Sequence, residues 1–517
     1  MKKMDQVNEN CGNANTTDAS SDTLDNVLSK IGFGKFNYVV IALAGITLAC
    51  VFLETVTINV ILPLAQCDLD MTTQDKSILS SIGFVGIILS SHLWGFLADT
   101  RGRKKVIVPT LFIASFLSLV SSIATSFWLL LLLRFLNGVF ISGPSATVYA
   151  YVGEFHSVEM RSRALMYVSA VLGLACYWYP GTASWILNQE WSHYFAALDI
   201  TLKPWRLFII IATLPTIVCA ICLLIFVPES PKYTFAQGDE AETLSILQLA
   251  YRKNKGNSFH LKIKSLTKDD EFGVGLKERN QNVFEFMWNQ TKPLFQHPHL
   301  KNTLRACFIQ FSIFSSTNGF WTFFPEIANG IGIWRYDGDQ PATICEIYNA
   351  TRSLQVNSNV SLASNQCLTK LEPSTFINIL VEHTIYAVGW IILAVIINKI
   401  GKLIAINSIF TICTISAITL IFSKSSLLSN ISYVTVMAVG LTITVVSAST
   451  AELCPTQYRA MALCLSLMVG RLGGVCGSLF IGFLMDHYCT YIFLMPAVLL
   501  AISACLTFTI PNIGNID

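Results

Sequence analysis

The segment "WGFLADTRGRKKV" (residues 94–106) places five ionisable side chains in a row between two long apolar runs. Asp99 comes first, followed by Arg101, Arg103 and the pair Lys104–Lys105, with Gly102 among them. Glycine permits a tight turn, and Lys and Arg beside membrane helices are kept on the cytoplasmic side. The segment therefore predicts a cytoplasmic turn between two membrane-spanning helices.

The rest of the 517-residue chain is poor in charge and rich in apolar side chains. It is 53% hydrophobic and only 13% charged, whereas soluble domains carry about 25% charged residues. Its mean hydropathy is +0.55. The composition predicts an integral membrane protein in contact with lipid. The net charge of +2 provides no extended basic face, so a nucleic-acid partner is excluded.

Apolar runs of about 20 residues recur along the chain, and each is long enough to cross roughly 30 Å of hydrocarbon as a helix. About twelve such runs are present, so we expect an all-α membrane protein with twelve transmembrane helices. The expected spans lie near 37–63, 77–98, 105–125, 127–150, 163–187, 206–227, 303–328, 376–398, 403–423, 431–449, 461–484 and 490–510.

Lys and Arg gather in alternate loops, which predicts that both termini are cytoplasmic. The polar first residues lack an apolar core and are not a signal peptide. The predicted divisions are a disordered tail (1–35), a first six-helix bundle (36–227), a cytoplasmic linker (228–302), a second six-helix bundle (303–510) and a short tail (511–517). Helical spacing of apolar residues predicts short helices in the linker at 241–253 and 283–290.

The second bundle is interrupted by residues 329–374, expected to form an extracellular or luminal loop. This segment contains the sequons at Asn349 and Asn359 together with Cys345 and Cys367. Sequons and paired cysteines are typical of an oxidising compartment. We expect glycosylation at both asparagines and a disulfide between the two cysteines.

Two short patterns occur once in each half of the chain. Glu and Arg stand seven residues apart in "GEFHSVEMRSRA" (153–164) and again in "AELCPTQYRAMA" (451–462), and Gly102 has a counterpart in Gly401. Parallel repeats of this kind indicate two bundles around a central cavity. The charges either form a gate at the inner rim or only set the topology. For Lys104–Lys105 we favour topology, and for the others a gate: Asp99, Arg101, Arg103, Glu154, Arg161, Glu452 and Arg459.

Several of these motifs resemble those of the major facilitator superfamily. "GFLADTRGRKK" is similar to its signature between helices two and three, "RFLNGVFISG" (134–143) to its fourth-helix motif, and "PESPKY" (228–233) to the sequence after helix six in sugar porters. Within the superfamily the chain resembles the synaptic vesicle glycoprotein 2 group and its invertebrate relatives. The resemblance is carried by "GFGKFNY" (32–38), "HLWGFLADTRGR" (92–103), "KPWRLF" (203–208), "FFPE" (323–326) and "ELCPTQYR" (452–459).

The chain departs from that group at identifiable places. The first helix carries Glu54 alone, with Val51 where a second acid is usual, and Asn398 stands where an Asp is usual. The large luminal insert of the group is reduced to about 45 residues. Functions tied to that insert are therefore not carried over to this chain.

Charged residues inside the membrane need partners or water. Glu54 and Arg134 lie at nearly the same depth of helices one and four, and we predict an ion pair between them. The pair either belongs to the substrate cavity or gives structural support without substrate contact. Glu54 becomes a candidate proton carrier only if it loses Arg134 as its partner. Arg471 lies in the middle of helix eleven with no acid at its level. It is expected to attract an anionic group of a substrate or to pair with an acid during rocking.

Helices seven and five carry the polar and aromatic side chains expected to line a cavity. Gly319 and Pro325 are expected to weaken helix seven, and "CYWYPG" (176–181) predicts a kink in helix five. Tyr177, Trp178 and Tyr179 of this segment could stack on a flat or cationic ligand, or could instead belong to the interfacial belt. Glu326 and Glu382, near the outer mouth, are expected to be solvated. The candidate cavity residues are Gln310, Ser316, Asn318, Trp321, Tyr177 and Trp178.

Two functions fit this pattern. The first is a secondary transporter of a small organic solute, with or without a coupling ion; the second is a non-transporting vesicle trafficking or interaction protein on the same scaffold. The chain lacks a P-loop, H-E-x-x-H and G-x-S-x-G, so an enzyme is not expected, nor a cofactor or metal. A monomer in the plasma membrane or a secretory or synaptic vesicle membrane is expected.

Overall fold

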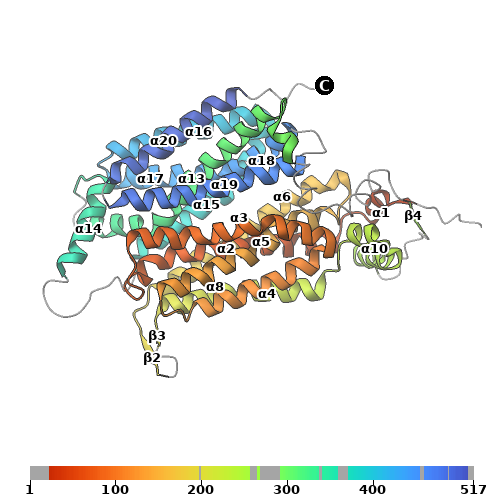
Figure 1. Ribbon diagram of the computed structural model, residues 1–517, viewed down its shortest axis with the longest axis horizontal. Helices are drawn as coiled ribbons and strands as arrows, with labels where there is room; N and C mark the ends of the chain where they lie inside the picture. Colours follow the sequence, from red (N-terminus) through yellow and green to blue (C-terminus); the bar gives the residue numbers. More distant parts are fainter. Residues whose placement is uncertain are drawn as a thin grey trace, which may run out of the picture.

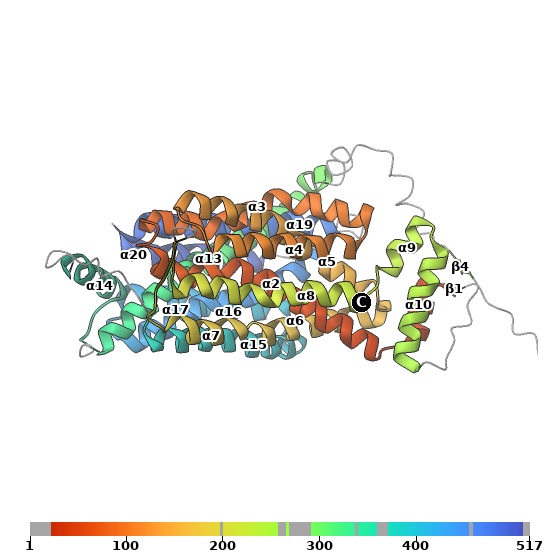
Figure 2. The same ribbon diagram turned by 90° about the horizontal axis from the view of Figure 1, so that it is seen from below.

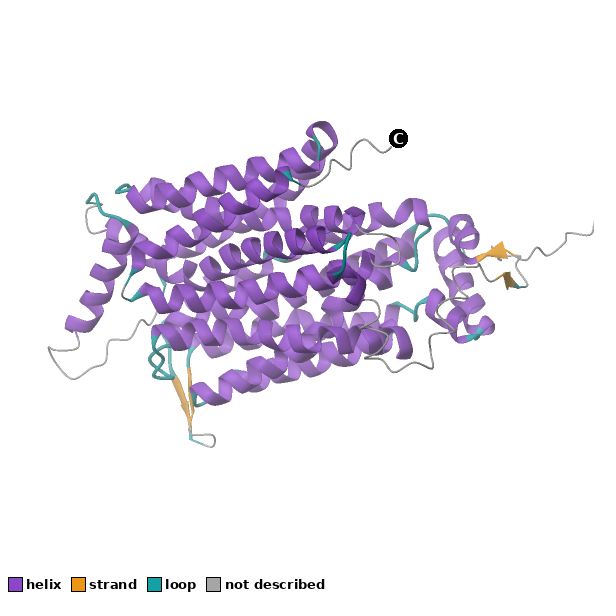
Figure 3. Ribbon diagram, turned by 45° about the horizontal axis from the view of Figure 1, so that its top comes forward, coloured by secondary structure: helices purple, strands orange, loops and turns teal. Residues whose placement is uncertain are grey.

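The computed structural model describes residues 22–196, 200–256, 265–267, 291–336, 340–358, 371–453, 459–486 and 488–509. Its helical spans lie side by side in two bundles (Figures 1 and 3). The first bundle consists of α2 (Lys35–Ala65), α3 (Thr73–Arg101), α4 (Arg103–Ser121), α5 (Phe127–Gly153), α6 (Val158–Ala175) continued by α7 (Trp178–Leu187), and α8 (Pro204–Phe226).

The second bundle repeats this arrangement after the linker. It consists of α13 (Leu300–Tyr336), α15 (Pro373–Ile400), α16 (Lys402–Phe422), α17 (Ser426–Met437) continued by η3 (Ala438–Leu441) and α18 (Thr442–Leu453), α19 (Arg459–Met485) and α20 (Cys489–Phe508). Among the described residues, 11 helices are long and apolar enough to cross a membrane. Together with α13 they make the twelve predicted spans.

The remaining span, α13, is less apolar than the other eleven, because its middle is rich in Ser, Thr and Asn. These side chains are buried inside the protein: Gln310, Ser312 and Ser316 have no exposed surface. The helix is continuous through Gly319 and Pro325, so the expected weakening of helix seven is wrong. Helix five is interrupted, since α6 ends at Ala175 and α7 begins at Trp178. The interruption lies just before the predicted Pro180–Gly181 step, and α7 is continuous through these two residues.

The two ends of the molecule carry different elements, and we name the faces after them (Figure 2). The tail face carries α1 (Leu24–Ile31), α9 (Pro231–Gln237) and α10 (Glu240–Lys255), with the parallel pair β1 (Asp22–Thr23) and β4 (Leu266–Thr267) and the short η2 (Lys292–Phe295). The hairpin face carries the antiparallel pair β2 (His193–Phe195) and β3 (Ile200–Leu202), and α14 (Ile344–Ser358). Both α1 and the end of α20 lie at the tail face (Figure 1).

The prediction of a disordered segment over 1–35 is wrong for Leu24–Ile31, which forms α1. Its buried residues Leu24, Val27, Leu28 and Ile31 follow helical spacing, and such an apolar stripe is stable once a partner covers it. That partner is α10, the linker helix predicted at 241–253. Asn254 fixes the contact, accepting from the Phe36 N–H (2.9 Å) and donating to the Gly32 carbonyl (3.1 Å). The second predicted linker helix, 283–290, lies outside the described residues.

The predicted loop at 329–374 is partly helical, since α13 extends to Tyr336 and α14 follows. Cys345 forms its disulfide with Cys489 at the start of α20, not with Cys367, so the predicted pairing is wrong. The reason is tertiary: α14 brings Cys345 to a residue 144 positions away. Asn349 is exposed on α14, while Cys367 and Asn359 lie outside the described residues.

Replacing Cys345 with serine is expected to lower the free energy of unfolding by about 2–4 kcal/mol, because a cross-link over a long loop restricts the unfolded chain. Thermal unfolding of the purified protein measures this. Cys489→Ser should cost the same amount, and the double variant no more than either single one. Cys505→Ser, at an exposed free cysteine, is the control. Additive losses in the double variant would contradict the pairing.

Candidate functional site

The first charged group lies at the tail face, where α3, α4 and α5 end or begin. Arg103 Nη2 is 2.9 Å from Asp99 Oδ1 and 3.0 Å from Glu154 Oε1. Glu154 also accepts a hydrogen bond from Ser230 of the linker. Burial raises the pKa of Glu154, while Arg103 opposes that effect. We call Asp99, Arg103 and Glu154 the tail-face charge cluster; it joins three helices of one bundle.

The turn beside this cluster depends on Gly102 and on Glu229 of the segment "PESPKY". Glu229 Oε1 accepts from the Lys104 N–H (3.0 Å) and Oε2 from the Lys105 N–H (3.3 Å). A carboxylate in this position satisfies amides that have no partner within the helix and suits the positive end of the helix dipole. Gly102 has φ +110°, and a Cβ there would lie 2.5 Å from Glu229 Oε2. The role of Glu229 as a cap of α4 was not predicted from the sequence, because its two partners lie 125 and 124 residues earlier in the chain.

The other predicted gate residues lie elsewhere. Arg161 donates to the Gly153 carbonyl (3.1 Å) and reaches Asp25 of α1 at 4.0 Å. Arg101 is exposed. Glu452 belongs to α18 and Arg459 to α19, but their side chains are outside the described part of the structure. The gating roles of these residues stay predictions.

The predicted ion pair between Glu54 and Arg134 is wrong as a direct contact, because a hydroxyl from α4 lies between the two side chains. Ser118 donates to Glu54 Oε2 and accepts from Arg134 Nη1 at 3.5 Å. Glu54 also accepts from Asn137 and Thr216, each at 3.2 Å. Glu54 and Arg134 line one small cavity inside the first bundle. Their predicted placement at one depth is therefore correct, although they do not form the predicted direct ion pair.

Arg471 extends from the middle of α19 to the opposite bundle. Its guanidinium donates to Ser91 of α3 (3.0 Å) and to Ser145 of α5 (3.1 Å). Both partners are uncharged hydroxyls, so within the described residues the positive charge of Arg471 has no ion pair. A positive charge without an ion pair in the middle of the helix fits the prediction that Arg471 attracts an anionic group of a substrate or pairs with an acid during rocking.

The polar residues of α13 have a different place from the predicted one. Gln310 donates to the Ile443 carbonyl (3.3 Å) and to Ser447 (3.0 Å) of α18, and Ser316 donates back to its own helix. Asn318 lies so close to α19 that a Cβ at Gly474 would be 2.4 Å from its Nδ2. These three side chains pack helices within the second bundle, as small and polar residues do in membranes, and do not line the cavities described here.

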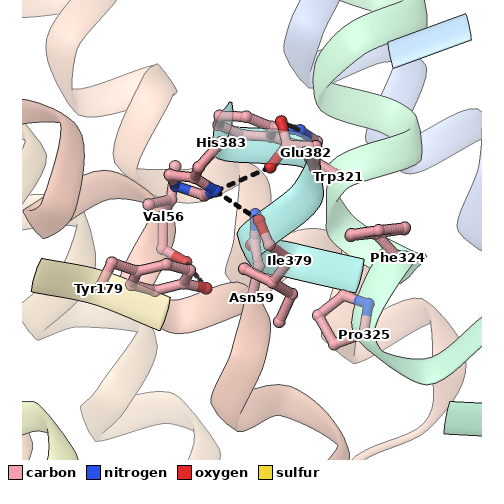
Figure 4. Close-up of a pocket in the computed structure, with 9 residues that line it drawn as sticks. All are labelled: Val56, Asn59, Tyr179, Trp321, Phe324, Pro325, Ile379, Glu382 and His383. Carbon is pink, nitrogen blue, oxygen red and sulfur yellow. Dashed lines mark hydrogen bonds and ion pairs between the residues drawn. The ribbon is translucent and has the colours of Figure 1, made fainter. Parts of the chain in front are cut away.

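A cavity of about 20 Å³ lies between the two bundles (Figure 4). Asn59 of α2 and Tyr179 of α7 approach it from the first bundle; Trp321 of α13 and Glu382 and His383 of α15 approach it from the second. We call these five residues the interbundle site. Of these five, Trp321 was predicted to line a cavity, and Tyr179 was named among the aromatics that could stack on a ligand. Tyr177 instead bonds Thr384 across the bundles (3.0 Å), and Trp178 is exposed, as an interfacial belt residue would be.

Within the interbundle site, Glu382 is buried, at 2% exposure, which contradicts its expected solvation. One carboxylate oxygen accepts from Trp321 Nε1 (3.0 Å) and the other is 2.9 Å from His383 Nδ1. His383 Nδ1 is also 2.9 Å from the Ile379 carbonyl, and its Nε2 has no protein partner. The imidazole stacks between the rings of Tyr179 (5.6 Å) and Trp321 (6.3 Å).

Further contacts join the bundles between this site and the hairpin face. Lys76 Nζ of α3 is 2.6 Å from Glu326 Oε2 of α13, and Thr73 donates to Asp486 (3.0 Å). Ser80 bonds both Asn59 and Thr322, each at 2.8 Å. Glu326 is therefore paired, not simply solvated. Together these contacts hold the hairpin side of the bundle interface closed.

Sequence comparisons identify relatives along most of the chain. A profile of the Major Facilitator Superfamily matches residues 44–341. Synaptic vesicle glycoprotein 2B of Homo sapiens is 25% identical over 385 residues, covering 70% of this chain and 55% of that protein. The Mus musculus protein is 27% identical over 327 residues, covering 59% and 47%. The chain thus spans about half the length of the curated relatives it matches.

Solved structures share the fold at low sequence identity. The xylose transporter XylE from E. coli, partially occluded and inward open, aligns with a TM-score of 0.61 and 12% identity, covering 92% of this chain and 100% of that one. A bacterial homolog of the human lysosomal transporter Spinster aligns with a TM-score of 0.59 and 14% identity, covering 91% and 96%. The twelve-helix arrangement predicted from the sequence is thereby confirmed.

Proposed function

Because the chain belongs to the major facilitator superfamily, we propose that it is a secondary transporter that moves a small organic solute across a membrane by alternating access. The observation that carries the proposal is the interface between the bundles. Its polar contacts run from Thr73–Asp486 at the hairpin face to Arg471 near the middle. An interface sealed by a few ion pairs and hydrogen bonds between two rigid units can open by rocking.

Two of the predicted charged groups have roles in alternating access: Arg471 and the tail-face charge cluster. Arg471 attracts an anionic group of the solute, because it reaches the interface with only hydroxyl partners. The tail-face charge cluster keeps α3, α4 and α5 together as the first bundle moves. The carboxylate of Asp99 is paired with Arg103, but 72% of its side chain is accessible, so it can exchange this partner for one on the second bundle in the opposite state.

The tail face is the cytoplasmic side in this proposal, since Lys and Arg concentrate there. The protein is a monomer, and the similarity to synaptic vesicle glycoproteins supports a vesicle membrane, with the plasma membrane as the alternative. A non-transporting scaffold protein is the competing function, but no contact described here favours it.

A cross-linking experiment tests alternating access without knowledge of the solute. Ser80→Cys and Thr322→Cys place two thiols where the native oxygens are 2.8 Å apart, so oxidation locks the hairpin side closed. A membrane-impermeant maleimide then probes Ser145→Cys from the tail face. The rate of maleimide labelling at Ser145→Cys should rise when the thiol pair is oxidised, and should fall back to its initial value when the pair is reduced. A labelling rate that is the same with and without this disulfide would contradict alternating access.

Replacing Arg471 with alanine is expected to reduce solute uptake by tenfold or more, because the mid-depth charge at the interface is lost. A thermal-shift screen of organic anions on detergent-purified protein supplies the solute, and uptake into proteoliposomes is then measured. Arg471→Lys, which keeps the charge, should retain part of the uptake. Unchanged uptake by Arg471→Ala would remove this residue from the solute site.

A further inference from the structure

The interbundle site holds a buried carboxylate with a single ionisable partner. We propose that Glu382 and His383 form a proton-binding site, and that a proton bound at His383 holds the hairpin side closed. This inference rests on the proposed transporter function and deepens it by naming the coupling ion as a proton.

The first support is charge balance. Glu382 is buried, and no lysine or arginine of the described chain forms an ion pair with it; His383 is its one basic partner. An ionised carboxylate in such a place is costly unless a positive charge neutralises it. The imidazolium form of His383 supplies that charge, so the closed site is electrically neutral when it carries one proton.

The second support is the placement of the hydrogens. His383 Nδ1 faces two acceptors, the Glu382 carboxylate and the Ile379 carbonyl, so this nitrogen carries a hydrogen in either charge state. The incoming proton therefore binds Nε2, the buried nitrogen without a protein partner. The adjacent cavity of about 20 Å³ has room for one water molecule that can deliver it.

The third support links the proton to closure. The imidazole lies between a ring of each bundle, Tyr179 of the first and Trp321 of the second (Figure 4). A cation within about 6 Å of an aromatic face is attracted to it. The imidazole is 5.6 Å from the Tyr179 ring, and this attraction exists only while the bundles meet. Protonation therefore favours the closed interface, and opening the hairpin side favours release of the proton.

Neighbouring groups do not compete for this proton near neutral pH. The other ionisable groups around Glu382 are the hydroxyls of Tyr179 and Tyr386 and the thiol of Cys176, which are neutral near pH 7. The same chemistry could neutralise Glu382 with an organic ammonium ion. The adjacent cavity of about 20 Å³ is close to the size of one water molecule, so the proton is the favoured ligand.

Double electron–electron resonance, which measures the distance between two spin labels, tests the inference on protein in nanodiscs and needs no solute. Spin labels at Gln74→Cys and Lys424→Cys, exposed at the hairpin ends of the two bundles, report closure, with the exposed native cysteines replaced by serine. We expect the closed-to-open ratio to rise about tenfold from pH 8.5 to pH 5.5. His383→Phe keeps a ring between Tyr179 and Trp321 without a titrating nitrogen, so its ratio should not depend on pH. His383→Gln serves the same purpose if the phenylalanine does not fit.

The control is His193→Phe, which alters an exposed histidine of β2 at the same face and should keep the full pH response. A wild-type ratio that ignores pH, or a pH response that persists in both His383 variants, would overturn the proton site. Closure of the wild type at pH 8.5 by tetramethylammonium would also overturn it, in favour of an organic cation. The cross-linking test measures labelling at the tail face at constant pH. Labelling that follows the disulfide lock, together with a spin-label ratio that ignores pH, would reject the proton site and leave alternating access standing.

Discussion

Replacing Glu326 with glutamine is expected to shift the equilibrium from the hairpin-closed to the hairpin-open arrangement by about five- to thirtyfold. The change leaves Lys76, whose side chain is 1% exposed, as a buried cation without its partner. Breaking a fully buried pair in this way costs about 3–5 kcal/mol. Since 26% of the Glu326 side chain is exposed, we expect the substitution to destabilise the closed arrangement by about 1–2 kcal/mol. Opening the interface hydrates Lys76 and relieves the cost.

The distance between spin labels at the hairpin ends of the bundles measures this shift. Lys76→Met should have a smaller effect than Glu326→Gln, because the carboxylate that it leaves behind is accessible to water. Lys203→Gln is the matched control: Lys203 pairs with Asp68 at the same face but inside one bundle, so the equilibrium should not move. Equal shifts in Lys76→Met and Glu326→Gln would show that burial of Lys76 does not decide the effect.

Replacing Gly102 with alanine is expected to destabilise the first bundle by about 3 kcal/mol. A side chain at φ +110° is strained by about 1–3 kcal/mol. The new Cβ would also lie 2.5 Å from Glu229 Oε2 and displace the carboxylate that binds the first amides of α4. Loss of a helix cap costs about 1 kcal/mol more. Thermal unfolding followed by size-exclusion chromatography measures the sum.

The repeat provides the matched control for this substitution. Gly401 is the counterpart of Gly102 and also has a positive φ, +85°, but a Cβ there meets nothing within 4 Å. Gly401→Ala should therefore lower the free energy of unfolding only by the backbone strain. If the two variants lost the same stability, Glu229 would not be acting as a cap, and the segment "PESPKY" would need another explanation.

The positions of the spans could be predicted because each depends on local sequence alone. Hydropathy, Lys and Arg placement and the two turn glycines act over about 20 residues, the thickness of the membrane in helical residues. They gave the twelve helices, the two parallel halves and the turn at Gly102. The helix α13 was found because its polar residues still lie between two clear ends, although its composition is less apolar than that of the others.

Side-chain partners were predicted less well, because a partner is chosen in three dimensions. Glu54 and Arg134 were placed correctly at one depth, yet Ser118 of a third helix lies between them. Cys345 had a nearer candidate in sequence, but α14 directs it to Cys489.

The sequence by itself determined a membrane protein of two repeated six-helix units, since periodicity and charge bias are properties of single segments. Only the tertiary structure decided where these units meet: Glu382 and His383 gained importance from Tyr179, which belongs to the opposite bundle. Contacts between distant helices are set by how the bundles pack, and a single sequence does not encode which distant residues face each other in any local pattern.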